Sequence, residues 1–184
     1  MASKRDGPAG IPAFLGEHLA LLKKNYSFSG YERDKVWLNR GGKSFTDISG
    51  VSGADSISDG RAAVFFDFDD DGDMDILLRA MHGRSLFLFR NEIGQRNRWL
   101  RVELTGTRSG RDAFGSVVRV KTASGTMTRI KQGGGRYCAQ SDPRLLFGLG
   151  SAEQVEWVEV TWPDGRKQKV ENAKAGETLR FEEK

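Results

Sequence analysis

Asp67-Phe68-Asp69-Asp70-Asp71-Gly72-Asp73-Met74-Asp75 is the stretch of this chain that decides its fold, and six of these nine residues carry carboxylates. Negative charges this close together repel one another unless a cation lies among them. A ligand set made only of oxygen atoms suits a hard divalent ion, above all Ca²⁺. Asp67, Asp69 and Asp71 alternate along the chain, so a curled loop can direct all three carboxylates toward one point. The stretch therefore predicts a calcium site.

The turn within this stretch predicts the remaining ligands. Gly72 stands where the backbone must turn sharply, which lets the Asp73 carbonyl face the ion and lets Asp75 complete the shell. An EF-hand loop shares this opening but needs a bidentate Glu at its twelfth position, which here is Leu78. The flanking apolar runs also indicate strands instead of helices. We therefore expect a short calcium loop between two strands, with an acidic, solvated surface turn as the alternative. The predicted metal ligands are Asp67, Asp69, Asp71, Asp73 and Asp75.

The chain around this loop reads as short strands after a single helix. Residues 13–24 place apolar side chains at helical spacing and are the only helix that the pattern predicts. A Gly/Ser/Asp-rich loop is expected at about 49–60. We expect residues 1–35 to form a leader with this short helix, and residues 36–96 to form a β-unit like one propeller blade. The strands expected in that unit are 36–39, 44–48, 61–68, 75–79 and 85–91.

The pattern changes after about residue 96. From Trp99 to Leu104 apolar and polar residues alternate, which places Leu100, Val102 and Leu104 on one face of a strand. Residues 97–184 are therefore predicted to form a β-sandwich or barrel, and the whole chain to be mainly β. Further strands are expected around Val118 and Val120 and at 126–131, 155–162, 167–171 and 178–181.

Composition narrows the classes of function. The 184 residues carry a net charge of +4, but the basic residues are scattered among acids, so we do not expect a nucleic-acid partner. Cys138 is the one cysteine; it excludes an internal disulfide, and we expect it to be a small core residue. No apolar run approaches membrane-spanning length. The first residues of the chain lack the apolar core of a secretion signal.

Two parts of the chain resemble known families. Asp59 to Asp75, together with the lead from Leu38 to Ser49, resembles an FG-GAP repeat, also called VCBS, the calcium-loop unit of integrin-type β-propellers. The second half resembles the ASPIC/UnbV domain. The resemblance implies an extracellular or periplasmic location and calcium-linked interaction roles, with no settled biochemical activity. The motifs of the second half are Asn97-Arg98-Trp99-Leu100, Arg111-Asp112-Ala113-Phe114-Gly115, Gln140-Ser141-Asp142-Pro143-Arg144-Leu145, Phe147-Gly148-Leu149-Gly150 and Val160-Thr161-Trp162-Pro163-Asp164-Gly165.

A second candidate site lies in the ASPIC/UnbV-like half. Gly133-Gly134-Gly135 lacks the Lys-Ser/Thr sequel of a phosphate-binding loop and is interpreted as a loop with positive φ. It leads into a polar segment whose side chains can cap a turn or face a ligand. The candidate ligand contacts are Tyr137, Gln140, Ser141, Asp142 and Arg144. For catalysis, neither His18 nor His82 stands in a recognisable pattern, so no catalytic residue is predicted.

These observations favour a non-enzymatic binding or adhesion module that carries a structural Ca²⁺ and has a protein or glycan partner. A carbohydrate-binding accessory module is the first alternative, and a Ca²⁺-dependent hydrolase is the second. We expect a monomer, with a dimer as the alternative, because one blade leaves sheet edges and aromatic side chains that other parts of the chain must cover.

Overall fold

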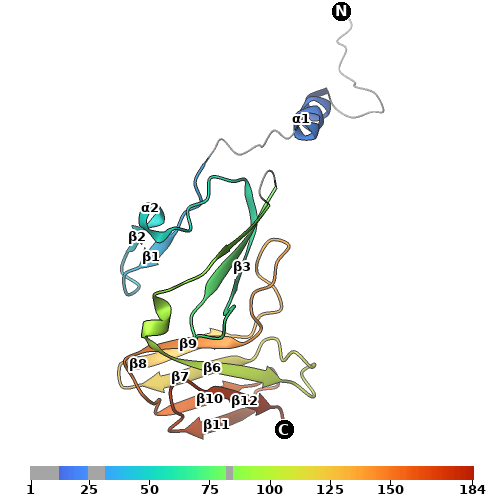
Figure 1. Ribbon diagram of the computed structural model, residues 1–184. Coiled ribbons are helices and arrows are strands. Elements are labelled where there is room, and N and C mark those ends of the chain that lie inside the picture. Colours follow the sequence, from blue (N-terminus) through green and yellow to red (C-terminus); the bar gives the residue numbers. More distant parts are fainter. Residues whose placement is uncertain (1–12, 25–31, 82–84) are drawn as a thin grey trace, which may run out of the picture. The chain divides into compact units, whose positions relative to one another are not determined.

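The computed structural model of the protein describes residues 13–24, 32–81 and 85–184, so His82 lies outside the described residues. It confirms the mainly β class and the single short helix near the N-terminus (Figure 1). The chain divides into two compact units. The first comprises Met1–Arg61 and Leu78–Phe87, and the second comprises Ala62–Leu77 and Leu88–Lys184. The domain boundary predicted between residues 96 and 97 stays a prediction.

The first unit holds the helix and a small hairpin. Helix α1 (Ala13–Lys23) lies where the helical spacing predicts it, and strands β1 (Trp37–Asn39) and β2 (Phe45–Asp47) pair antiparallel. The hairpin turn is fixed by the side-chain oxygen of Asn39, which accepts a hydrogen bond of 2.7 Å from the Gly42 amide. A short helix, α2 (Ser49–Ser52), occupies the beginning of the segment expected to be loop.

Strands β3 (Gly60–Phe66), β4 (Asp75–Ala80) and β5 (Leu86–Phe89) form a three-stranded sheet in that order. The acidic stretch is the connection from β3 to β4, so the sequence placed it correctly between strands. The boundaries between the two units fall inside these three strands. Residues 62–77, which include the acidic loop, belong to the second unit.

The rest of the second unit is built from two sheets, seen as the stacked strands labelled β6 to β12 in Figure 1. One sheet has the order β11-β10-β7-β8, and the other has the order β12-β6-β9, in which β12 runs parallel to β6. A short 3₁₀ helix, η2 (Gly94–Arg96), precedes them. The strands are β6 (Arg98–Thr105), β7 (Val117–Thr122), β8 (Gly125–Ile130), β9 (Leu145–Gly150), β10 (Trp157–Thr161), β11 (Lys167–Glu171) and β12 (Thr178–Glu182).

A single hydrophobic core lies between these two sheets. Alternate residues of β6 and β7 point inward, so that Leu100 and Val102 from one sheet join Val118 and Val120 from the other, all fully buried. Each such side chain contributes about 1.5–3 kcal/mol by leaving water. The prediction of a sandwich or barrel is thereby resolved: among the described residues the sheets face each other as a sandwich, and none closes into a barrel.

The other face of the β6–β9 sheet positions the site. Alternation sends Trp99 and Arg101 of β6 to this outer face, where Leu146 of β9 is the neighbour of Arg101 in register. Yet Arg101 is only 5% exposed, because the acidic loop from β3 to β4 lies over it and pairs with it through Asp67. Leu146 is also buried, at 7% exposed. The outer face of the sandwich therefore becomes the floor beneath the predicted metal ligands.

Candidate metal centre and neighbouring pocket

The acidic loop curls as its alternating carboxylates predict. One carboxylate oxygen from each of Asp67, Asp69 and Asp71 lies within 4.8 Å of the others. The curl is held by hydrogen bonds from the Gly72 amide to Asp67 (3.0 Å) and from the Asp73 amide to Asp71 (3.1 Å). Gly72 at φ 93° and Asp70 at φ 58° make the reversal of the chain. The structure thus brings three of the five predicted ligands to one point.

The other two predicted ligands hold the ends of the loop. Asp75 is fully buried, and its two oxygens accept hydrogen bonds from the amides of Phe68 (2.8 Å) and Asn91 (2.7 Å). Asp73 accepts one from the Gln95 amide (2.9 Å). The group of three does not include these two carboxylates, and their roles as metal ligands stay predictions.

Two buried oxygens in this loop have no hydrogen-bond partner among the described residues: Oδ1 of Asp67 and Oδ1 of Asp73. Burial raises the pKa of the Asp67 carboxyl, although the Gly72 amide and the Arg101 charge oppose it. Burial also raises the pKa of Asp73 to about 6; the Gln95 amide opposes this shift, and the neighbouring carboxylates add to it. A divalent cation would satisfy such oxygens and offset their repulsion, and an oxygen-only donor set fits Ca²⁺.

Arg101 is the residue of this site that the sequence did not reveal. Its guanidinium forms a buried ion pair with Asp67 and donates a hydrogen bond of 3.1 Å to Asp70. It also lies over the ring of Trp99, 4.9 Å from the ring centroid. Alternation along β6 predicts only that Arg101 points away from the core. No local signal distinguishes it from the exposed basic residues of the other strands.

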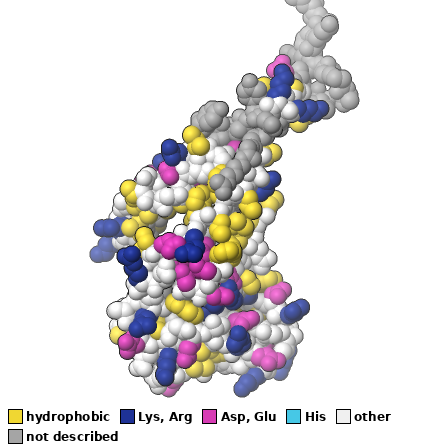
Figure 2. All heavy atoms as spheres, viewed as in Figure 1, with side chains coloured by type: hydrophobic (Ala, Val, Ile, Leu, Met, Phe, Trp, Pro, Cys, Tyr) yellow, Lys and Arg dark blue, Asp and Glu magenta, His cyan; other side chains and the backbone are white. Residues whose placement is uncertain are grey.

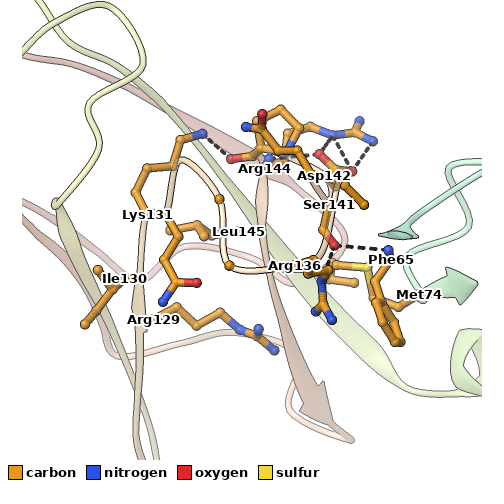
Figure 3. A pocket seen from close by; sticks show the side chains of 17 residues that line it. Phe65, Met74, Arg129, Ile130, Lys131, Arg136, Ser141, Asp142, Arg144 and Leu145 are labelled. Atoms are coloured by element: carbon orange, nitrogen blue, oxygen red, sulfur yellow. Dashed lines mark hydrogen bonds and ion pairs between the residues drawn. The ribbon is translucent and has the colours of Figure 1, made fainter. Parts of the chain in front are cut away.

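Beside the loop, the second unit contains a pocket of about 460 Å³ (Figure 3). Its wall runs from the end of β8 through the loop that leads into β9, and Phe65 and Met74 complete it from β3 and the acidic loop. Four of the predicted ligand contacts line it: Gln140, Ser141, Asp142 and Arg144. Tyr137, which is 72% exposed, is not among the lining residues.

Hydrogen bonds join the pocket to the acidic loop. The hydroxyl of Ser141 accepts one from the Phe65 amide (3.1 Å), and the Phe65 carbonyl accepts one from the Asp142 amide (2.9 Å). Arg144 then bridges the two sites, at 2.7 Å from Asp142 and 3.1 Å from Asp70. Burial pushes the pKa of Asp142 upward, but hydrogen bonds from Arg144 bring that pKa below its ordinary value. The Asp142 carboxylate is therefore charged and already paired.

The pocket also has three basic lining residues that were not predicted, Arg129, Lys131 and Arg136. One expectation for this loop is wrong. Cys138 was predicted to be a core residue, but it is exposed and has a positive φ of 48°. The loop from 132 to 140 keeps its side chains mostly at the surface, so a small apolar residue there has no core to enter. The prediction of a positive φ in the Gly run is confirmed at Gly135, where φ is 129°.

Two segments of the chain match known protein families. Residues 106–184 match the ASPIC and UnbV family, and residues 25–78 match the FG-GAP-like repeat. The chain carries an FG-GAP-like repeat followed by an ASPIC and UnbV domain. The matched FG-GAP-like segment includes the whole acidic loop and ends at Leu78 in β4. The matched ASPIC and UnbV segment includes β7 to β12 and the pocket loop.

The chain is also similar to cartilage acidic protein 1 from three animals. It is 43% identical to the protein from Homo sapiens over 112 residues, which make up 58% of this chain and 16% of that protein. Against the Mus musculus protein it is also 43% identical over 112 residues, 58% of this chain and 17% of the relative. Against Xenopus tropicalis it is 38% identical over 134 residues, 70% of this chain and 18% of the relative. The matched region thus spans less than a fifth of the length of these relatives.

Two further features of the described residues are the distribution of charge on one face and the character of the helices. On the face drawn in Figure 2, basic side chains are interspersed with acidic ones over the second unit. Within residues 13–24, 32–81 and 85–184, no helix combines the length and the apolar character that crossing a membrane requires.

Proposed function

We propose that the chain is a non-enzymatic, calcium-binding interaction module, with Ca²⁺ held by the acidic loop. The observation that carries the proposal is the convergence of Asp67, Asp69 and Asp71 next to buried carboxylate oxygens that have no hydrogen-bond partner in the described part of the chain. Oxygen atoms at this density and depth match the donor set of Ca²⁺. An FG-GAP-like repeat over the same residues supports the same ion.

The role of the ion in this proposal is structural. The loop lies on β6 through Arg101 and is tied to η2 through the hydrogen bond between Asp73 and the Gln95 amide. An ion held by Asp67, Asp69 and Asp71 would fix the loop in this curled form. The loop in turn carries Met74, which lines the pocket. Calcium would therefore stabilise the surface through which the module binds its partner.

An extracellular location is part of the proposal. The similarity to cartilage acidic protein 1 and the FG-GAP-like repeat support it. Millimolar calcium outside cells would suit a site of moderate affinity, because extracellular calcium modules bind with dissociation constants of about 10⁻⁴–10⁻³ M. The partner of the module is a protein or a glycan.

Thermal unfolding with and without calcium tests the metal assignment. An ion that binds only the folded chain adds about 2.7 kcal/mol to the free energy of unfolding at a concentration 100 times its Kd. Millimolar Ca²⁺ should therefore raise Tm above the value in EDTA. Asp71→Ala, which removes the ligand oxygen altogether, should abolish the rise. Glu156→Gln removes one charge at an exposed position of the same unit and should leave the rise unchanged. Identical melting curves in calcium and EDTA would refute the site.

A further inference from the structure

The pocket beside the acidic loop has an imbalance of charge. Four of its lining residues are basic and one, Asp142, is acidic. Arg144 neutralises Asp142 with contacts of 3.0, 3.0 and 2.7 Å between its guanidinium and the carboxylate. Among the described residues Arg129, Lys131 and Arg136 form no ion pair. The pocket therefore presents three cations without a matching anion.

Lys131 is the most constrained of these cations. It is 5% exposed, and its ammonium donates a hydrogen bond to the backbone carbonyl of Pro143, drawn in Figure 3. Burial lowers the pKa of this ammonium, while more distant acids, Asp112 first, oppose the shift. A buried ammonium has three N–H donors, and a carbonyl accepts one of them. An anion at this position would take the others and offset the cost of burial.

The two arginines are arranged as further donors. Arg136 lies over the ring of Phe65 at 4.3 Å and donates to the Ser141 hydroxyl at 2.8 Å, as Figure 3 shows. Arg129 lies over the ring of Phe147 at 5.6 Å. Each guanidinium has five N–H donors in a planar fork, which matches the oxygens of a carboxylate or a sulfate. The contact with a ring face holds each guanidinium at the pocket wall.

The remaining lining residues indicate which kind of ligand molecule would carry the anionic group. Gln132 and Gln140 contribute amides, which both donate and accept hydrogen bonds, as ring hydroxyls require. Phe65, Met74 and Leu145 contribute apolar surface. A volume of about 460 Å³ lies in the range of small-molecule sites. A compact ring with several hydroxyls and one acidic group fits this lining better than an extended peptide, which has few hydroxyls.

We propose that the pocket binds an acidic saccharide, whose carboxylate or sulfate groups are taken by Lys131 at one part of the pocket and by Arg129 and Arg136 at another. This inference deepens the proposed interaction function by naming a class of ligand, and it rests on that function only in treating the module as a binding protein. Saccharide binding in the pocket does not require calcium, so an experiment that refutes the calcium site does not by itself refute the pocket, or the reverse.

Titration with defined oligosaccharides tests the inference. Tetragalacturonate is the acidic probe, maltotetraose is the neutral control, and tetraglutamate presents the same charges on a peptide. Calorimetry and amide chemical shifts are followed at about 0.15 M salt, near physiological screening. Tetragalacturonate should bind and shift the amides of residues 129–145, and maltotetraose should not. Equal binding of maltotetraose, tighter binding of tetraglutamate, or no binding of tetragalacturonate would overturn the proposal.

Matched variants locate the binding. Arg129→Gln should weaken tetragalacturonate binding about tenfold, the usual effect of losing one charge-assisted hydrogen bond. Arg136→Gln should weaken it similarly, while Arg108→Gln, at an exposed position that does not line the pocket, should not. Unchanged affinity in both pocket variants would refute the site. All titrations are repeated in EDTA: binding that persists there while calcium leaves Tm unchanged would refute the calcium site alone.

Discussion

Gly72 lies directly against the indole ring of Trp99, so close that a Cβ atom on Gly72 would overlap the ring. The contact joins the sharpest turn of the acidic loop to the outer face of β6. Gly72 therefore meets two requirements at once: a φ of 93° that favours glycine, and a surface that leaves no room for a side chain.

The first prediction separates these two requirements. Gly165 has a φ of 88° with open space around its Cβ position, so Gly165→Ala measures the cost of the backbone conformation alone, about 1–2 kcal/mol. Gly72→Ala should cost about 1–3 kcal/mol more, because it also forces the loop away from Trp99. Urea unfolding of both variants gives the difference. Equal losses would mean that the loop does not lie on the ring.

The second prediction concerns the buried ion pair between Arg101 and Asp67. Arg101→Met leaves a carboxylate buried without its cation, which costs about 3–5 kcal/mol. Calcium would supply positive charge to the same carboxylate, so Arg101→Met should lower the free energy of unfolding clearly less in calcium than in EDTA. Denaturant unfolding of the native chain and the variant in both conditions measures this difference.

Arg98→Gln is the control for this prediction. Arg98 is 60% exposed and lies 3.9 Å from Glu153, so its loss should cost no more than about 1 kcal/mol in either condition. If Arg101→Met were equally destabilising with and without calcium, the ion and Arg101 would not share Asp67.

The spacing of residues was enough to predict the acidic loop because its geometry is local. Alternation of Asp67, Asp69 and Asp71 around Gly72 determines which side chains converge, and the flanking apolar runs determine that strands enclose them. The inward faces of β6 and β7 were predictable for the same reason, since alternation with period two is a property of the strand itself.

The parts that sequence did not predict depend on contacts between distant segments. Arg101 lies at a polar position of an ordinary strand and Lys131 directly follows one, and both become buried only when other segments cover them. Strand β9 was not predicted because Gly148 and Gly150 interrupt its apolar run and resemble loop punctuation. Its antiparallel pairing with β6 supplies what its residues lack in strand propensity.

The third prediction is the acid sensitivity of Glu183. Its carboxylate accepts hydrogen bonds from the amides of Thr107, Arg108 and Ser109 and from the Ser109 hydroxyl. The Ser109 amide is the largest cause that lowers the pKa of Glu183, to about 2 from an ordinary value of 4.5, against the opposing effect of burial. Because the pKa is lowered by folding, this carboxylate stabilises the fold fully above pH 4.5, and the stabilisation disappears as pH falls toward 2.

The measurement is the free energy of unfolding against pH for the native chain and for Glu183→Gln. The variant should be less stable at neutral pH, and the two curves should approach each other between about pH 4.5 and pH 2. Glu156→Gln controls for the loss of one negative charge at an exposed position. Parallel curves for the native chain and Glu183→Gln would contradict the role of this carboxylate.

The fourth prediction is that residues 97–184 fold without the rest of the chain. Every residue of the hydrophobic core cluster lies between Leu100 and Phe181, so the fragment contains the whole core of the sandwich. It should give a β-type circular dichroism spectrum and a cooperative melt. Its Tm should be lower than that of the full chain, because Trp99 loses the cover of Gly72 and Arg101 loses its ion pair with Asp67. A fragment without cooperative unfolding would mean that the loop is required for folding.

The last prediction follows from the hydrogen bonds between the two candidate sites. Phe65 stands two residues before Asp67. Its amide donates a hydrogen bond to the Ser141 hydroxyl, and its carbonyl accepts one from the Asp142 amide. An ion that fixes the acidic loop should therefore also fix the pocket, and should raise affinity for tetragalacturonate by roughly fivefold or more. By linkage, tetragalacturonate must then raise the affinity for calcium by the same factor.

Calorimetry of each ligand in the absence and presence of the other tests this reciprocity. Ser141→Ala removes the acceptor of the Phe65 amide and should reduce the coupling factor toward one, while calcium binding itself persists because Ser141 touches none of the loop carboxylates. Thr128→Ala, on the exposed surface of β8, is the control and should keep the full factor. A coupling factor of one in the native chain, with both ligands bound, would show that the sites are neighbours without communication. The hydrogen bonds of Phe65 would then position the β3 strand and transmit nothing.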